Sequence, residues 1–144
     1  MPFCISGGTA LAEGKGEILT NLPPLPAAFF VVCKPHFTCS TPQLFSLVKC
    51  EKIRARPDTA GIITALEKSD LGGIARRMYN VFEDILPRGR HEVDRIKLAL
   101  LDYGALGAVM TGSGPTVFGV FDDKNSAHRA YEHLKPEYEE CFLV

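Results

Sequence analysis

Residues Val109 to Phe121 read VMTGSGPTVFGVF, two apolar runs separated by a Gly-Ser-Gly-Pro turn. The runs are rich in β-branched and aromatic residues, which favour buried strands. Gly112 and Gly114 allow a positive φ and the close approach of another backbone or of a phosphate. The stretch therefore predicts a hairpin, with Gly107 to Thr111 paired to Thr116 to Phe121, whose tip presents a glycine loop.

Two familiar phosphate-binding motifs do not fit this loop. Gly107 and Gly112 have the spacing of the P-loop glycines, but Ser113 follows directly, without the lysine of that motif. Gly112, Gly114 and Gly119 have the wrong spacing for a dinucleotide fingerprint, and the loop is expected to enter a strand and not a helix. On its letters alone, a Gly-Ser-Gly between two strands is more often a turn than a site.

The composition is that of one ordinary globular domain. The chain has 144 residues, of which 46% are hydrophobic and 23% charged, and its formal net charge is −1. A domain of this size buries roughly 68–70% of its unfolded surface, which is enough for one core. Because the charge is close to zero, no basic field is available for a nucleic-acid backbone, and no nucleic-acid partner is expected.

Cysteine usage and the apolar runs predict a soluble, cytoplasmic protein. The five cysteines are odd in number and contain no CxxC pair, which favours reduced thiols over a disulfide framework. The first residues lack the basic and apolar regions of a signal peptide. The longest apolar run, Pro26 to Cys33, is far short of the roughly 20 residues of a membrane helix, so no membrane partner is expected. The histidines offer no pair on one helical face, and no metal site is predicted.

Residues 1–26 predict a hairpin and a connector. Two extended pieces, Gly8 to Glu13 and Glu17 to Leu22, flank a Gly-Lys-Gly turn, and Asn21 to Pro26 (NLPPLP) is a rigid link because proline excludes helix and sheet interior. Two strands alone are marginally stable. The hairpin therefore needs a surface from the rest of the chain or from an absent domain, and the domain proper is expected to span residues 27–144.

The remaining chain predicts strands and helices in a definite order. Ala28 to Lys34 is expected as a strand covered on both faces. Thr41-Pro42 would start a helix over Gln43 to Val48, with Thr41 as its cap. Caps and apolar periodicity further predict a helix after Asp58-Thr59 and one continuous helix that begins at Asp70, ends at Pro87 and has Leu71, Ile74, Met78, Phe82 and Ile85 on its buried face. The next helix is expected to run through Val93, Ile96, Leu100 and Tyr103 and to stop at Gly104. A helix from Asp122-Asp123 to Leu134 and a last strand over Glu140 to Val144 complete the chain.

From residue 28 the order is strand, helices, strand, strand, helix, strand. This is the split βαβ (ferredoxin-like) plan of the α+β class, in which an antiparallel four-stranded sheet carries its helices on one face. The predicted fold is that domain plus the N-terminal hairpin. From the residues alone, such a fold suits a stand-alone small-molecule-binding module as well as part of an enzyme.

Several motifs resemble those of a known kinase superfamily. Met110 to Phe121 (MTGSGPTVFGVF), preceded by Leu101 to Gly107 (LDYGALG), resembles the third signature of the GHMP kinases, which phosphorylate small molecules. Within that superfamily, the chain resembles the 4-diphosphocytidyl-2-C-methyl-D-erythritol kinases over essentially all 144 residues. The motifs behind this narrower resemblance are Pro2-Phe3-Cys4, Gly7 to Ala10, Gly14 to Glu17, Leu22-Pro23, Lys34-Pro35, Ser40-Thr41-Pro42 and Asn80 to Glu83 (NVFE).

The resemblance implies an enzyme of which one half is missing. These kinases use ATP and Mg²⁺ to phosphorylate the 2-hydroxyl of their substrate in the non-mevalonate route to isoprenoid precursors. Their phosphate-binding loop, a catalytic lysine and most of the cytidine pocket belong to an N-terminal domain, and their catalytic aspartate would fall one residue before Met1. The chain is therefore expected to be a C-terminal domain with no catalytic residue of its own, inactive and without bound cofactor when alone, whose partner is the N-terminal kinase domain.

The resemblance also implies roles for five residues. Thr41 and Phe45 match positions that line the substrate pocket in the family, with the aromatic ring stacking on the cytosine. Gly112, Ser113 and Gly114 would shape the nucleotide site beside the phosphate-binding loop of the missing half. Without the resemblance, Thr41 could be only a helix cap and Phe45 only a core residue.

An exposed seam is expected where the missing domain would lie. Phe3, Ile5 and the glycine loop should face that domain, and an apolar patch there should promote self-association. Two alternatives stay open, a stand-alone split βαβ binding module and the C-terminal half of another GHMP kinase. The hairpin within the first 22 residues disfavours the module, and the combination of Ser40-Thr41-Pro42 with Phe45 would be unexpected in another GHMP kinase.

Overall fold

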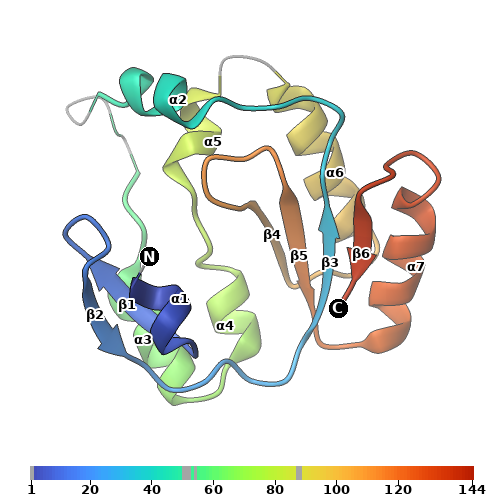
Figure 1. The fold of residues 1–144 in the computed structure, drawn as a ribbon. Coiled ribbons are helices and arrows are strands. Elements are labelled where there is room, and N and C mark those ends of the chain that lie inside the picture. Colours follow the sequence, from blue (N-terminus) through green and yellow to red (C-terminus); the bar gives the residue numbers. More distant parts are fainter. Residues whose placement is uncertain (1, 50–52, 54, 87–88) are drawn as a thin grey trace.

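A four-stranded antiparallel sheet forms the centre of the computed structural model, which describes residues 2–49, 53, 55–86 and 89–144 (Figure 1). Its strands are β3 (Phe29–Cys33), β4 (Gly107–Met110), β5 (Val117–Phe121) and β6 (Cys141–Leu143), in the spatial order β4-β5-β3-β6. The predicted split βαβ plan is thereby confirmed. The predicted hairpin is present as well, with Gly107 opposite Val120 and Met110 opposite Val117.

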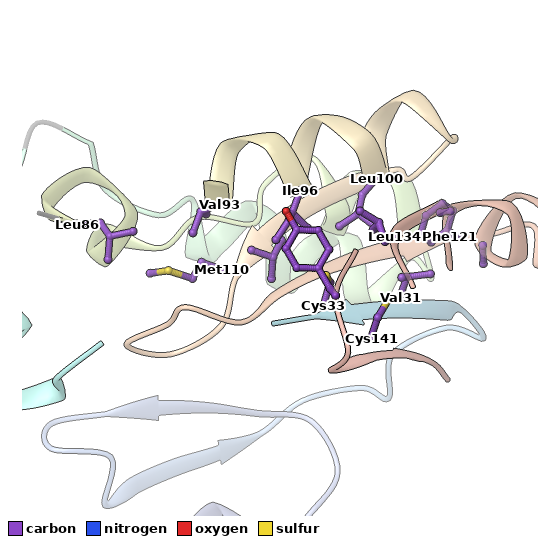
Figure 2. Close-up of a cluster of buried hydrophobic side chains, with 14 of the residues drawn as sticks. Val31, Cys33, Leu86, Val93, Ile96, Leu100, Met110, Phe121, Leu134 and Cys141 are labelled. Carbon is purple, nitrogen blue, oxygen red and sulfur yellow. The ribbon is translucent and has the colours of Figure 1, made fainter. Parts of the chain in front are cut away.

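Two helices cover one face of the sheet. They are α6 (Arg90–Asp102) and α7 (Lys124–Leu134), both close to their predicted ranges. Figure 2 shows the main core between α6 and the strands, where Ile96 and Leu100 meet Val31 and Phe121. Gly119 of β5 lets α6 approach closely, since an added Cβ there would lie 3.2 Å from the Cβ of Leu100.

The strand predicted over Ala28 to Lys34 is present as β3, but the opposite face of the sheet is only half covered, so the predicted coverage of this strand on both faces is wrong. Val31 and Cys33 of β3 point to the helices and are buried, whereas Phe30 and Val32 are half-buried on the other face. Phe30 packs there against Phe118, with ring centroids 6.3 Å apart. An apolar run was not enough to predict double coverage, because both long helices lie on one side.

A second group of elements gathers beside the β4 edge (Figure 1). It comprises α1 (Pro2–Ser6), β1 (Ala10–Glu13), β2 (Ile18–Asn21), α3 (Thr59–Glu67) and α4 (Leu71–Ala75), of which only α1 was not predicted. Leu22 and Ile62 pack on a small cluster of Ala65, Leu66 and Ile74, so the rest of the chain gives the hairpin connector a surface. α4 contacts β4 at Gly107, where an added Cβ would lie 2.4 Å from the carbonyl oxygen of Ala75.

The helix predicted over Leu71 to Ile85 is wrong, because the chain breaks into α4 and α5 (Val81–Ile85). Asn80 is extended at the break, with φ −135° and ψ 113°, and its Oδ1 accepts from the Phe82 N–H at 3.0 Å. Side chains of this kind compete with the helical hydrogen bonds and favour caps. Pro87, expected to end this helix, lies outside the described residues.

Most other helix boundaries follow the predicted chemistry. Asp58, Asp70 and Asp123 are N-caps whose carboxylates accept a backbone N–H in the first turn of α3, α4 and α7. For α2 (Thr41–Leu47), however, the N-cap is Ser40 and not Thr41. Leu44 of α2 is buried in the main core and fixes the position of that helix.

The four cysteines of the described chain, Cys4, Cys33, Cys39 and Cys141, are free thiols, and the fifth, Cys50, lies outside it. Cys33 and Cys141 face each other across β3 and β6 (Figure 2). Their hydrogen bond and burial raise the pKa of the Cys33 thiol well above its usual range. Within the described residues, no helix has the length and apolar character needed to cross a membrane.

Candidate nucleotide and substrate site

The glycine loop connects β4 to β5 at one end of the sheet. Gly112 and Gly114 have φ values of 54° and 75°, so both use the left-handed conformation that glycine permits. Gly114 lies on Met110, whose Sδ would be 2.3 Å from an added Cβ. At Gly112 an added Cβ would meet no atom within 4 Å, so this part of the loop is open to an approaching ligand or domain.

Asn80 holds the loop from the side. Its Nδ2 donates to the carbonyl oxygens of Met110 and Gly112, at 2.7 and 2.8 Å. The break between α4 and α5 therefore places the Asn80 amide where it can bind the loop, since a continuous helix would not place this amide at the same point. The sequence carried one signal for this role, because asparagine is a helix-capping residue in the middle of an otherwise helical pattern.

Thr41 and Ser113 are brought together by the fold. The Oγ atoms of these two side chains are 2.6 Å apart, a hydrogen bond between residues 72 positions apart in sequence. Thr41 begins α2, and Ser113 is the tip of the glycine loop. The helix expected to carry substrate-pocket residues thus lies directly against the loop expected at the nucleotide.

Phe45 is on the surface, which rules out the core role. The residue is 60% exposed, and its ring packs edge-to-face on Phe82 of α5, with centroids 5.0 Å apart and an interplanar angle of 76°. Thr41, as shown above, is not the cap of α2. The simpler interpretations of both residues are therefore wrong, and an exposed aromatic ring near the loop is available for stacking.

Two cavities flank α2 without including these residues. One of about 680 Å³ lies between the end of α2 and α5, lined by Leu47, Val48, Lys49, Ile53, Ala55, Val81, Asp84, Ile85 and Arg90. The other, of about 410 Å³, lies at the start of α2 and is lined by Phe37, Thr38, Cys39, Ser40, Gln43, Leu44 and Leu86. Thr41, Phe45 and the loop instead form an open surface. Over the described ranges, no group of three His, Cys, Asp or Glu residues could hold a metal ion.

Comparisons with known proteins identify the family to which this fold belongs. Residues 62–140 match the family described as GHMP kinases C terminal. A 4-diphosphocytidyl-2-C-methyl-D-erythritol kinase of Clostridium botulinum (strain Langeland) is 41% identical over all 144 residues of this chain, which span 51% of that protein. The chain therefore spans about half the length of the curated relatives it matches.

Solved structures give the same result for the fold. A crystal structure of a 4-(cytidine 5'-diphospho)-2C-methyl-D-erythritol kinase superimposes with a TM-score of 0.79 at 28% identity, over 99% of this chain and 51% of that one. A homoserine kinase from Cytophaga hutchinsonii shares the fold at a TM-score of 0.71 and 23% identity, over 99% of this chain and 48% of that one. Because the family match covers more than half of the chain, from within α3 to the residue before β6, the chain belongs to the GHMP kinase family and is a C-terminal domain of that family.

Proposed function

We propose that this chain is the C-terminal half of an ATP-dependent kinase acting on the 2-hydroxyl of 4-diphosphocytidyl-2-C-methyl-D-erythritol. The 41% identity to a kinase of that name over the whole chain supports this substrate. The structural observation that carries the proposal is the hydrogen bond between Thr41 and Ser113, which joins α2 to the glycine loop. Phosphoryl donor and acceptor must meet in such a kinase, and these two elements meet here.

The residues of the open surface have distinct proposed roles. Phe45 stacks on the cytosine of the substrate through its exposed ring, a contact that is worth roughly 1–3 kcal/mol in nucleic-acid binders. Thr41 lies near the polar groups of the substrate. Gly112, Ser113 and Gly114 shape the nucleotide site, since the open space at Gly112 permits close backbone approach.

ATP, bound with Mg²⁺, would supply the phosphoryl group that is transferred. The open glycine loop fits one side of such a site, but the described residues offer no acidic cluster for the metal. Phosphoryl transfer depends on positioning and on charge neutralisation. We therefore assign the metal ligands, the phosphate-binding loop and the base to an N-terminal half, and propose that this chain alone is inactive.

The N-terminal half is proposed to dock on the first 26 residues. This segment has several exposed apolar side chains, among them Ile5 at 90% and Ile18 at 55% exposure, together with Phe3 and Leu25, which are less exposed. We take these side chains as the surface that the other half covers, since large exposed apolar patches mark interaction sites. Without the other half, the same surface would favour self-association.

Complementation tests the proposal. The purified chain would be mixed with a separately produced N-terminal half of the Clostridium botulinum kinase, and ATP-dependent phosphorylation of 4-diphosphocytidyl-2-C-methyl-D-erythritol would be followed. We expect turnover by the mixture and by neither half alone. Turnover by the chain alone would contradict the need for a second half, and turnover of homoserine or mevalonate in place of this substrate would favour another GHMP kinase.

A substitution at Phe45 then tests the pocket assignment. Phe45→Ala should raise the KM for the cytidyl substrate about 5- to 150-fold in the complemented enzyme, the factor that corresponds to losing 1–3 kcal/mol of stacking. The KM for ATP should stay unchanged. Phe142→Ala, which removes an exposed ring from β6, is the matched control and should change neither constant. Equal effects of the two substitutions on KM would contradict the assignment of Phe45 to the substrate pocket.

A further inference from the structure

The end of β4 has backbone groups that no strand can pair. β4 is an edge strand of the sheet. The Thr111 N–H donates to the carbonyl oxygen of Thr116 on the β5 side at 2.8 Å. Since the hydrogen-bonding direction alternates along an antiparallel strand, the N–H and C=O of the preceding residue, Met110, point away from β5. Met110 is 1% exposed, so these groups need partners inside the protein.

α5 supplies those partners through side chains. Oε1 of Glu83 accepts from the Met110 N–H at 2.6 Å, and Nδ2 of Asn80 donates to the Met110 carbonyl oxygen at 2.7 Å. Together the two side chains take the place of a neighbouring strand at this point. They also protect an edge that would otherwise be open to pairing with another chain.

A charge pair holds Glu83 in place. Its second carboxylate oxygen, Oε2, forms an ion pair with Nζ of Lys97 on α6, and the two side chains are only 14% and 23% exposed. Partly buried pairs are screened far less than surface pairs, and removing one partner leaves the other without compensation. The Lys34–Glu140 pair offers a contrast in the same chain, since its side chains are 34% and 58% exposed.

Met110 in turn supports the glycine loop. Its side chain lies under Gly114, and Asn80 binds both the Met110 and the Gly112 carbonyl oxygens. We infer that Glu83, fixed by Lys97, is a positioning residue: it sets the place of Met110 and through it the place of the 112–114 loop. Its effect on phosphoryl transfer rests on the proposed function, whereas its effect on the loop does not.

Amide hydrogen exchange on the 144-residue chain tests the effect on the loop. The Thr111 and Gly114 amides donate to Thr116 and Thr111, so their protection reports on the loop. In Lys97→Met and in Glu83→Gln we expect these two amides to exchange about 10- to 100-fold faster, as for one lost charged hydrogen bond. Amides of α7 should change no more than in the control Lys34→Met. Unchanged loop exchange, or equal acceleration in α7, would overturn the positioning role.

Kinetics of the complemented enzyme provide a second, separate readout. Each of the two variants should lower kcat about tenfold and leave the KM for the cytidyl substrate within twofold, because the loop shapes the proposed nucleotide site whereas Phe45 of α2 holds the cytosine. Glu83→Ala should lower kcat further than Glu83→Gln does, because the amide oxygen of glutamine can still accept from the Met110 N–H. A rise in KM at constant kcat would contradict the inference. If the unsubstituted chain shows no complementation, the proposed function fails while the exchange experiment still decides the role of Glu83.

Discussion

The two parts of this molecule differ in the size of the apolar core that each encloses. The sheet body (β3 to β6 with α6 and α7) encloses large residues such as Phe121, Ile96 and Tyr138, each at most 1% exposed. The N-terminal satellite (α1, β1, β2, α3 and α4) has only a small cluster around Leu66 and leaves Ile5 on the surface. A large core of the first kind contributes more to stability than a small cluster of the second kind. The difference agrees with a chain that spans half of its relatives.

Truncating one core residue in each part should expose this difference most strongly. Phe121→Ala removes a fully buried ring from the body and should lower the free energy of unfolding by about 3–5 kcal/mol. Leu66→Ala should cost about 2 kcal/mol, the low end for such a change, because the small satellite cluster can collapse around the gap. Urea unfolding of the two variants measures both values. Equal losses would show that the satellite cluster collapses around the gap no better than the core of the body does.

The fold of the body was predictable because its signals are local. The sequence VMTGSGPTVFGVF carries its own turn, and Asp123 caps α7, the helix that follows it. The break at Asn80 was not predictable, since its amide bonds to carbonyl groups 30 and 32 residues away. Local periodicity favoured a continuous helix, and a tertiary contact decided otherwise. The half-open face of β3 has the same cause, because coverage of a strand depends on where distant helices pack.

The site was less predictable than the fold. No periodicity relates Thr41 to Ser113, and only the family resemblance suggested that both matter. Glu83 appeared in the sequence only within the motif NVFE, and its link to Lys97 and Met110 depends on how α5 meets α6 and the sheet edge. Residues that position a loop without contacting its ligand form no recognisable motif in a single sequence. Their role becomes visible only from hydrogen bonds in the folded chain.

Replacing the capping aspartate of one helix in each part should change helix stability in a pH-dependent way, by less than the core substitutions do. The Gly61 N–H and the Arg77 guanidinium lower the pKa of Asp58, the N-cap of α3, and Ser126 lowers the pKa of Asp123, the N-cap of α7. A folded-state pKa below the unfolded value of about 3.9 means that the stabilisation is complete above that value and is lost as the pH falls through the folded pKa. Asp58→Asn should therefore weaken α3 at pH 7 and make little difference near pH 2.

The matching variant in the body is Asp123→Asn, with the same expected pH dependence in α7. Protection factors for the α3 and α7 amides, measured for both variants at pH 7 and at low pH, give the comparison. Asp58→Asn should reduce protection in the satellite alone, since Asp58 and Arg77 join only α3 to the residues after α4. Loss of protection in α7 on replacing Asp58 would show that satellite and body are energetically coupled.

The smallest change in stability is expected at the exposed satellite surface. Ile5→Ser and Ile18→Ser should each alter the free energy of unfolding by no more than about 0.5 kcal/mol, because these side chains are 90% and 55% exposed. Their expected effect is on association: sedimentation at high concentration should show less self-association than in the unchanged chain, and complementation by an N-terminal half should weaken. Leu98→Ser, at a residue of α6 that is 60% exposed, is the control and should leave both unchanged. If Leu98→Ser alone reduced association, the docking surface would lie on the body, and the satellite would be a complete part of the fold and not an interface.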